Sequence, residues 1–265
     1  MYSQPTGPRS IGGVLDDAVR LYRGSFRYIL PLLIISAILA AIPSLMLGLN
    51  QPGATTQAAQ TRALLQAVTA PGYWIAILVV SLVNLILYGA LFGAIDSIAK
   101  GGKMGLGEAL QLGLSRLPRL FGASFLFGLM LFIGFLLLLI PGIYLMGVFQ
   151  LVFVAIVLED ARIGEAFGTS RRLIKGHWWR STVIVTVAII ILIVLSLLVG
   201  VVGGFLAALK PGVGTVLIVN QLVGLIVNIV VVGWMPCVLL AMYYDLKVRH
   251  EGGDLAIRVD ALAAR

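Results

Sequence analysis

The sequence has very few of the residues that soluble proteins depend on. It contains one cysteine, Cys237, among 265 residues, which excludes an intrachain disulfide. Charged residues make up 11% of the chain, less than half of the roughly 25% typical of a soluble globular domain. Hydrophobic residues make up 60%, and the mean hydropathy is +1.06. This composition predicts an integral membrane protein.

Catalytic motifs are also missing. The chain has two histidines, His177 and His250, and contains no zinc-protease, nucleophile-elbow or phosphate-loop motif. Neighbouring carboxylates occur at Asp16 and Asp17, but adjacent residues of a helix point in different directions, and acidic residues at a helix start usually serve the dipole. We therefore expect no catalytic residues, no metal site and no cofactor.

The net charge of +8 does not indicate a nucleic-acid-binding protein. No zinc-finger, helix-turn-helix or aromatic stacking motif accompanies the basic residues, and these residues flank long apolar runs. We expect membrane lipids rather than nucleic acid as partners.

Six apolar runs are long enough to cross a hydrocarbon layer of about 30 Å. They cover residues 28–49, 73–97, 119–140, 142–158, 181–208 and 215–245. The runs are too long and unbroken for barrel strands, and a helix satisfies its own backbone hydrogen bonds in lipid. The sequence therefore predicts an all-α integral membrane protein with six transmembrane helices and no cleavable signal before the first one.

Basic residues predict the orientation of these helices. Of the 19 lysines and arginines, only Arg62 and Lys210 lie in connections on the opposite side from the N-terminus. The positive-inside rule places the other side, with both termini, in the cytoplasm. The expected location is a bacterial inner membrane.

A short pattern recurs three times along the chain. Residues 11–15, 106–110 and 163–167 are similar, and an aromatic residue stands fifteen positions after the first residue of each. Two apolar runs follow each copy, and the second run of each pair ends in acidic residues: Asp96, then Glu159 with Asp160, then Asp245. The sequence predicts a single membrane domain, 1–265, with three parallel repeats at about 11–98, 106–160 and 163–246, followed by a cytoplasmic tail, 247–265.

We call the segment from each copy of the pattern to the following apolar run a lead-in segment. Two of the three lead-in segments are amphipathic at helical spacing. In the third copy, Phe167, Ser170 and Ile174 share one face, and basic residues lie opposite. In the second copy, Pro118 is expected to break the helix late. Such helices can lie in the membrane interface or serve as elbows that lead into the next span. If they lie in the interface, the candidate contacts for anionic headgroups are Arg20, Arg23, Arg27, Arg171, Arg172, Lys175 and Arg180. Aromatic residues near the span ends are candidate interface anchors, namely Trp178, Trp179, Tyr243 and Tyr244.

Polar residues inside the apolar runs are few and uncharged. They are Asn84, Gln150, Asn220, Gln221 and Asn228. The apolar centres contain no ionisable residue that would mark a proton or ion pathway. The five amides are expected to pair between helices or, alternatively, to line a path for a small amphiphile. The glycine pairs Gly89 with Gly93 and Gly200 with Gly204 would allow close helix approach. The polar insert 50–72 is expected to be an ordinary polar loop, with a short helix near 60–68 as the alternative.

Four motifs occur in an order that resembles a known family. They are I-G-x-V-L-D-x-A-x-R-L-Y-R from Ile11, P-G-I-Y-L from Pro141, G-H-W-W-R from Gly176 and Y-Y-D-L from Tyr243. Together they resemble the glycerophosphoryl diester phosphodiesterase membrane-domain family and related six-span bacterial proteins. In some members this domain precedes a soluble phosphodiesterase barrel. Only twenty residues follow Asp245 here, so the resemblance implies the membrane domain without that activity.

The sequence thus favours a non-catalytic inner-membrane protein that handles or senses lipid, or that supports a partner acting on lipid. The alternative is a transporter or channel for a small amphiphile. The expected partners are anionic lipid headgroups, with a second copy of the chain or another membrane protein as a further alternative.

Overall fold

The structure is a computed structural model that describes residues 7–46, 57–137, 139–209 and 213–263. The secondary structure in these ranges is helical, without strands. The helices are α1 (Ile11–Met46), α2 (Gln57–Thr69), α3 (Pro71–Ala99), α4 (Leu106–Leu137), α5 (Leu139–Val148), α6 (Val152–Leu158), α7 (Ile163–Ile174), α8 (Trp178–Leu209) and α9 (Val213–Ala263).

Six helical segments are long and apolar enough to cross a membrane. They are Ile11–Pro43, Pro71–Ala99, Leu106–Leu137, Leu139–Leu158, Trp178–Phe205 and Gln221–His250. The predicted all-helical, six-span architecture is therefore confirmed at this level, and the protein is a polytopic membrane protein. The end of the first predicted span, residues 47–49, lies outside the described residues.

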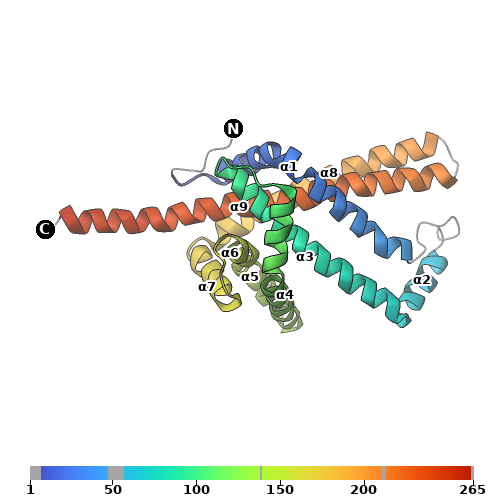
Figure 1. The fold of residues 1–265 in the computed structure, drawn as a ribbon, viewed down its shortest axis with the longest axis horizontal. Coiled ribbons are helices and arrows are strands. Elements are labelled where there is room, and N and C mark those ends of the chain that lie inside the picture. The colour runs from blue at the N-terminus through green and yellow to red at the C-terminus, as the bar shows by residue number, and fades with distance from the viewer. Residues whose placement is uncertain (1–6, 47–56, 138, 210–212, 264–265) are drawn as a thin grey trace.

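The spans form three hairpins that diverge from a shared centre (Figure 1). They are α1 with α3, α4 with α5 and α6, and α8 with α9, and the closest neighbours between hairpins are α1 with α9 and α3 with α4. Large buried side chains gather near the centre, including Leu21, Phe92 and Ile156. Toward the hairpin tips, apolar side chains such as Leu136, Leu197 and Val201 are exposed, as suits contact with lipid chains.

Each copy of the recurrent pattern begins a helix. Helices α1, α4 and α7 start at the first residue of the three similar segments. In α4 and α7, the carboxylate of Glu108 or Glu165 accepts a hydrogen bond from the backbone N–H three residues earlier, at 3.0 and 2.9 Å. In α1, the hydroxyl of Ser10 accepts from the N–H of Gly13 at 3.0 Å. The recurrence therefore includes the chemistry of helix starts.

The three lead-in segments continue differently. In the first two copies the lead-in and the following span form one helix, α1 or α4. In the third copy, α7 ends before a turn at Gly176, whose φ of +84° is a conformation that glycine adopts without strain. The helix break expected at Pro118 in the second copy is wrong, because α4 continues through Pro118. The turn at Gly176 in the third copy was not predicted.

The fourth span is broken, and α7 fills the break. The chain leaves α5 after Val148 and enters α6 at Val152. The buried hydroxyl of Ser170, on α7, donates to the carbonyl of Val148 at 2.8 Å and accepts from the N–H of Leu151 at 3.2 Å. These bonds satisfy backbone groups that the break releases inside an apolar region.

The apolar face of α7 consequently packs on protein. Phe167, Ser170 and Ile174 are buried, and the first of these stacks edge-to-face on Phe149 with ring centroids 5.0 Å apart. The interfacial interpretation of the sequence placed this face among the acyl chains. In the structure this face is instead buried against protein, where Ser170 bonds to the broken span. This packing suits the alternative interpretation of α7 as an elbow that leads into the next span.

Close helix contacts occur at some of the predicted glycines. Gly89 of α3 faces Gly113 of α4, where a Cβ built on Gly89 would lie 3.1 Å from the Cα of Gly113. For Gly200 and Gly204 of α8, in contrast, an added Cβ would have no neighbouring atom within 4 Å. The glycine spacing alone could not show which pair is used, because the spacing does not identify the helix that packs against it.

The polar insert and the segment after Asp245 are both helical. The polar insert holds α2 at the far end of the first hairpin, so the loop favoured from the sequence is wrong for residues 57–69 and the alternative, a short helix, is present. Helix α9 continues beyond Asp245 to Ala263, so most of the predicted tail, 247–265, extends the last span and projects from the bundle (Figure 1).

Candidate functional site

The three acidic span ends lie together at one end of the bundle. Two adjacent tyrosines of α9 connect them: the hydroxyl of Tyr244 donates to Asp96 at the end of α3, and that of Tyr243 donates to Glu159 after α6. Tyr243 is 2% exposed and Tyr244 8%. We call this end of the molecule the basic end, because most of the arginines and lysines discussed below also lie there.

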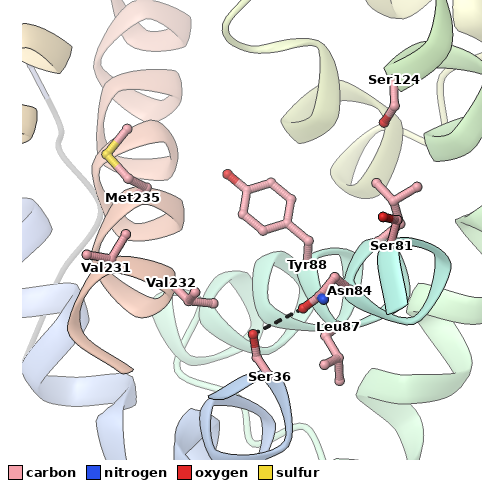
Figure 2. Close-up of a pocket in the computed structure, with 10 residues that line it drawn as sticks. Ser36, Ser81, Asn84, Leu87, Tyr88, Ser124, Val231, Val232 and Met235 are labelled. Carbon is pink, nitrogen blue, oxygen red and sulfur yellow. Dashed lines mark hydrogen bonds between the residues drawn. The ribbon is translucent and has the colours of Figure 1, made fainter. Parts of the chain in front are cut away.

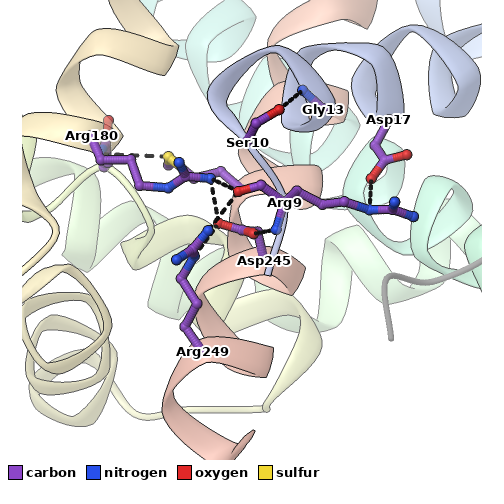
Figure 3. Close-up of polar contacts among 9 residues, drawn as sticks. Arg9, Ser10, Gly13, Asp17, Arg180, Asp245 and Arg249 are labelled. Carbon is purple, nitrogen blue, oxygen red and sulfur yellow. Dashed lines mark hydrogen bonds and ion pairs between the residues drawn. The ribbon is translucent and has the colours of Figure 1, made fainter. Parts of the chain in front are cut away.

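Asp245 follows the two tyrosines and organises the centre of the basic end (Figure 3). Its carboxylate is 1% exposed and accepts hydrogen bonds from Arg180 of α8 and Arg249 of α9, both at 2.9 Å. It also accepts from the backbone N–H of Arg9 at 2.7 Å. The carbonyl of Arg9 in turn accepts from the same two arginines, at 2.6 and 2.5 Å. The N-terminal segment is thereby held against α8 and α9.

Other ion pairs join the remaining elements at this end. Asp160, between α6 and α7, binds Arg116 and Arg119 of α4. Lys100 pairs with Asp96 at 2.7 Å, and Lys247 approaches Glu159 at 3.6 Å. The carboxylates at the span ends are therefore engaged by basic or phenolic side chains, a pattern that stabilises the junction between hairpins.

The predicted headgroup contacts divide into two groups. Arg180 belongs to the network around Asp245, so its guanidinium is committed within the protein. The others have exposed side chains, and within the described part of the chain none of them forms an ion pair. This second group consists of Arg20, Arg23 and Arg27 on α1 and Arg171, Arg172 and Lys175 at the end of α7.

The predicted interface anchors also divide. Trp179 is 74% exposed, in a position suited to an interface. Trp178 packs against Tyr144 with ring centroids 5.7 Å apart, and its indole N–H donates to the carbonyl of that residue at 3.3 Å. Tyr243 and Tyr244 lie inside the protein rather than at a surface, because their hydroxyls bind the acidic span ends.

Two histidines meet beside this network. The rings of His177 and His250 pack edge-to-face with centroids 6.0 Å apart. The Nε2 of His250 lies 3.0 Å from the carbonyl of Leu173, which can only accept, so this nitrogen carries a proton. Burial lowers the pKa of His177 below its usual 6.5, and the charges of Arg249, His250 and Arg180 lower it further, against a smaller opposite effect of Asp245.

A cavity of about 600 Å³ lies between α1, α3, α4 and α9, and it is partly open to the side (Figure 2). Ser36 of α1 donates to the amide oxygen of Asn84 at 3.2 Å, and the amide nitrogen of Asn84 donates to the carbonyl of Val80 at 3.0 Å. Tyr88 of α3 points into the space between α9 and α4. The other lining residues are Ser81, Leu85, Leu87, Ser124, Val231, Val232 and Met235.

The other intramembrane amides lie elsewhere. Gln221 and Asn228 line a second cavity of about 410 Å³ between α1 and α9, where the Oδ1 of Asn228 is buried without a hydrogen-bond partner in the described residues. Gln150 lies at the break between α5 and α6, 3.9 Å from the sulfur of Met242. The side chain of Asn220 lies outside the described part of the structure. The structure thus does not bring the predicted polar lining together at one site.

Several residues of these sites were not found from the sequence. Arg9, Ser36 and Tyr88 carry no motif of their own, and their roles depend on which helices meet. The one available signal was the tyrosine pair directly before Asp245, because buried phenols near carboxylates generally donate to them. Within the described ranges, no group of three or more His, Cys, Asp or Glu residues could hold a metal ion.

Comparisons with known proteins identify no relative of this chain: no family model, no curated protein and no solved structure matches it.

Proposed function

We propose that this polytopic membrane protein is a non-catalytic module that binds anionic lipid headgroups at its basic end. The observation that carries the proposal is the division among its basic residues. Arg9, Arg180 and Arg249 hold the network around Asp245. The six exposed residues of α1 and α7 have no such role in the described structure, and they are available to lipid phosphates.

The chemistry of the exposed residues suits this role. A lysine or arginine near an anionic membrane surface contributes about 1 kcal/mol to attraction, and salt screens the contribution. Arg171, Arg172 and Lys175 lie within five positions of one another at the end of α7, and Trp179 is exposed nearby in sequence. The proposal includes a cytoplasmic basic end, with both termini there, in a bacterial inner membrane.

Two further points support the proposal. The carboxylates of the span ends are bound by phenolic or basic side chains, so they are not available as catalytic groups at the junction. The motifs that resemble the glycerophosphoryl diester phosphodiesterase membrane domain suggest a setting in phospholipid metabolism. We also propose that the three lead-in and hairpin units are parallel repeats, since their acidic ends share one end of the bundle.

The test compares two variants with the same change in charge. Arg171→Gln/Lys175→Gln removes two positive charges from the basic end, and Arg62→Gln/Lys210→Gln removes two from the opposite connections. We expect the first variant to retain about thirtyfold less anionic lipid after purification at low salt, since two charges are worth about 2 kcal/mol. The second should retain as much as the unaltered protein. Equal retention by both variants would remove the basis for the proposal.

A further inference from the structure

The cavity of about 600 Å³ that Asn84 lines contains hydroxyl groups without hydrogen-bond partners among the described residues. Within the described residues, the hydroxyls of Ser81, Tyr88 and Ser124 form no hydrogen bond, although all three line this cavity. Serine hydroxyls in helices commonly bond to a backbone carbonyl of the preceding turn. In a region without bulk water, an unpaired hydroxyl costs free energy, so these groups favour a ligand that supplies donors and acceptors.

The cavity lies near the middle of the membrane. Asn84 precedes Asp96 by twelve residues on α3, which is about 18 Å along the helix axis. Met235 precedes Asp245 by ten residues on α9, or about 15 Å. Both distances are close to half of the hydrocarbon thickness of about 30 Å. The site is therefore at a depth that lipid chains occupy.

The lining determines the class of ligand. None of the ten residues that line the cavity is charged. A phosphate or carboxylate placed there would lose its hydration with no cation to offset the loss, whereas hydroxyl and ester oxygens could pair with the serine and tyrosine hydroxyls. The apolar side chains of Leu85, Val232 and Met235 suit the hydrocarbon part of such a molecule.

The volume of the cavity and its open side indicate how the ligand is placed. A volume of about 600 Å³ is within the range of about 300–1,000 Å³ typical of small-molecule sites. It accommodates a polar group with the first part of its chains, and the partly open side leaves room for the remaining chains to extend into the bilayer. Figure 2 shows the hydroxyl of Tyr88 directed into this space.

We infer that this cavity binds the polar group of an uncharged lipid bearing hydroxyl and ester oxygens. Tyr88, Ser81 and Ser124 hydrogen-bond to these oxygens, and the paired Ser36 and Asn84 form the wall behind them. The site is distinct in chemistry and position from the anionic surface at the basic end, so either can fail without the other.

The experiment uses the full chain in phosphatidylcholine vesicles with one of two photoactivatable probes. The first probe is a diacylglycerol, and the second is a phosphatidic acid with the same chains. We expect the diacylglycerol to label peptides of α3 or α9 that line the cavity, and the phosphatidic acid to label them at least about fivefold less, because burial of its unpaired charge is costly. Equal labelling by the two probes would overturn the inference.

Two tyrosine variants separate the site from general lipid contact. Tyr88→Phe removes one hydroxyl from the cavity and should lower diacylglycerol labelling about two- to tenfold, the effect of one hydrogen bond. Tyr28→Phe removes a hydroxyl from an exposed position on α1 and should leave the labelling unchanged. Unchanged labelling in Tyr88→Phe, with the protein folded as judged by its thermal unfolding, would also overturn the inference. Labelling lost in both variants would indicate surface lipid only and would contradict it as well.

Discussion

At the scale of single residues, the basic end depends on pairs whose members come from distant parts of the sequence. Tyr244 of α9 and Asp96 of α3 are separated by 148 positions, and Asp245 and Arg9 by 236. The sequence identified the acidic span ends and the neighbouring tyrosines but assigned the tyrosines to the membrane interface. Aromatic residues near the end of a span usually lie at the membrane interface, which favours that assignment. The tyrosines are internal only because α9 packs between the other hairpins.

The bond between Tyr244 and Asp96 can be tested by Tyr244→Phe. The substitution keeps the buried ring and removes the donor to the carboxylate. Hydrogen bonds to charged groups contribute about 1.5–3 kcal/mol, so the free energy of unfolding in detergent should fall by about that amount. Tyr28→Phe is the control and should change it by less than about 0.5 kcal/mol. Equal stabilities of the two variants would show that the tyrosine bond does not hold the hairpins together.

The lowered pKa of His177 makes stability depend on pH. Because folding disfavours the protonated ring, its contribution is fully present above pH 6.5, the usual pKa, and is lost as the pH falls through the lower pKa of the folded protein. We expect the melting temperature to decrease below about pH 6.5, and His177→Gln should reduce this decrease. A melting temperature that rises on acidification through this range would contradict the assigned direction.

At the scale of elements, hydrophobic periodicity and length were sufficient to predict the spans. They could not predict that the fourth span breaks between Val148 and Val152, because a single polar residue, Gln150, in an apolar run does not by itself end a helix. The break is stable because Ser170 of α7 satisfies its backbone groups. The amphipathic pattern of α7 therefore reflects packing on protein on one face and exposed arginines on the other.

The close contact between α3 and α4 can be tested at Gly113. In Gly113→Ala, the new Cβ would overlap the backbone carbonyl oxygen of Ile86 and lie 3.0 Å from the backbone nitrogen of Ala90, and neither helix backbone can move easily. The free energy of unfolding should fall by about 1–3 kcal/mol, as for other overpacked sites. Gly200→Ala adds the same methyl group where no atom lies within 4 Å, and it should be neutral or slightly stabilising. Similar losses in both variants would mean that α3 and α4 do not approach closely at Gly113.

At the scale of the whole molecule, the acidic ends of three hairpins meet at one end, and their apolar tips diverge (Figure 1). The charge distribution of the sequence anticipated that these residues share a side of the membrane. The cavity near Asn84 was not predictable, because it depends on the way three hairpins spread apart, which no local pattern encodes.

The orientation of the molecule can be measured with introduced cysteines. Cys237 is fully buried and provides a low background for labelling. We expect Ala58→Cys on α2 to react with a membrane-impermeant maleimide in intact spheroplasts, and Gly168→Cys on α7 to react only after permeabilisation. Both positions are exposed in the structure. The reverse pattern would place the basic end outside.

Headgroup binding at the basic end can be tested by the lipid that the full chain retains. The protein is purified from membranes that contain equal amounts of phosphatidylglycerol and phosphatidylethanolamine, and the bound lipid is quantified by mass spectrometry at increasing salt. Binding of anionic headgroups at the basic end predicts that phosphatidylglycerol is enriched several-fold at low salt and that the enrichment declines as salt screens the basic end. A bound-lipid ratio equal to that of the membrane at every salt concentration would contradict it.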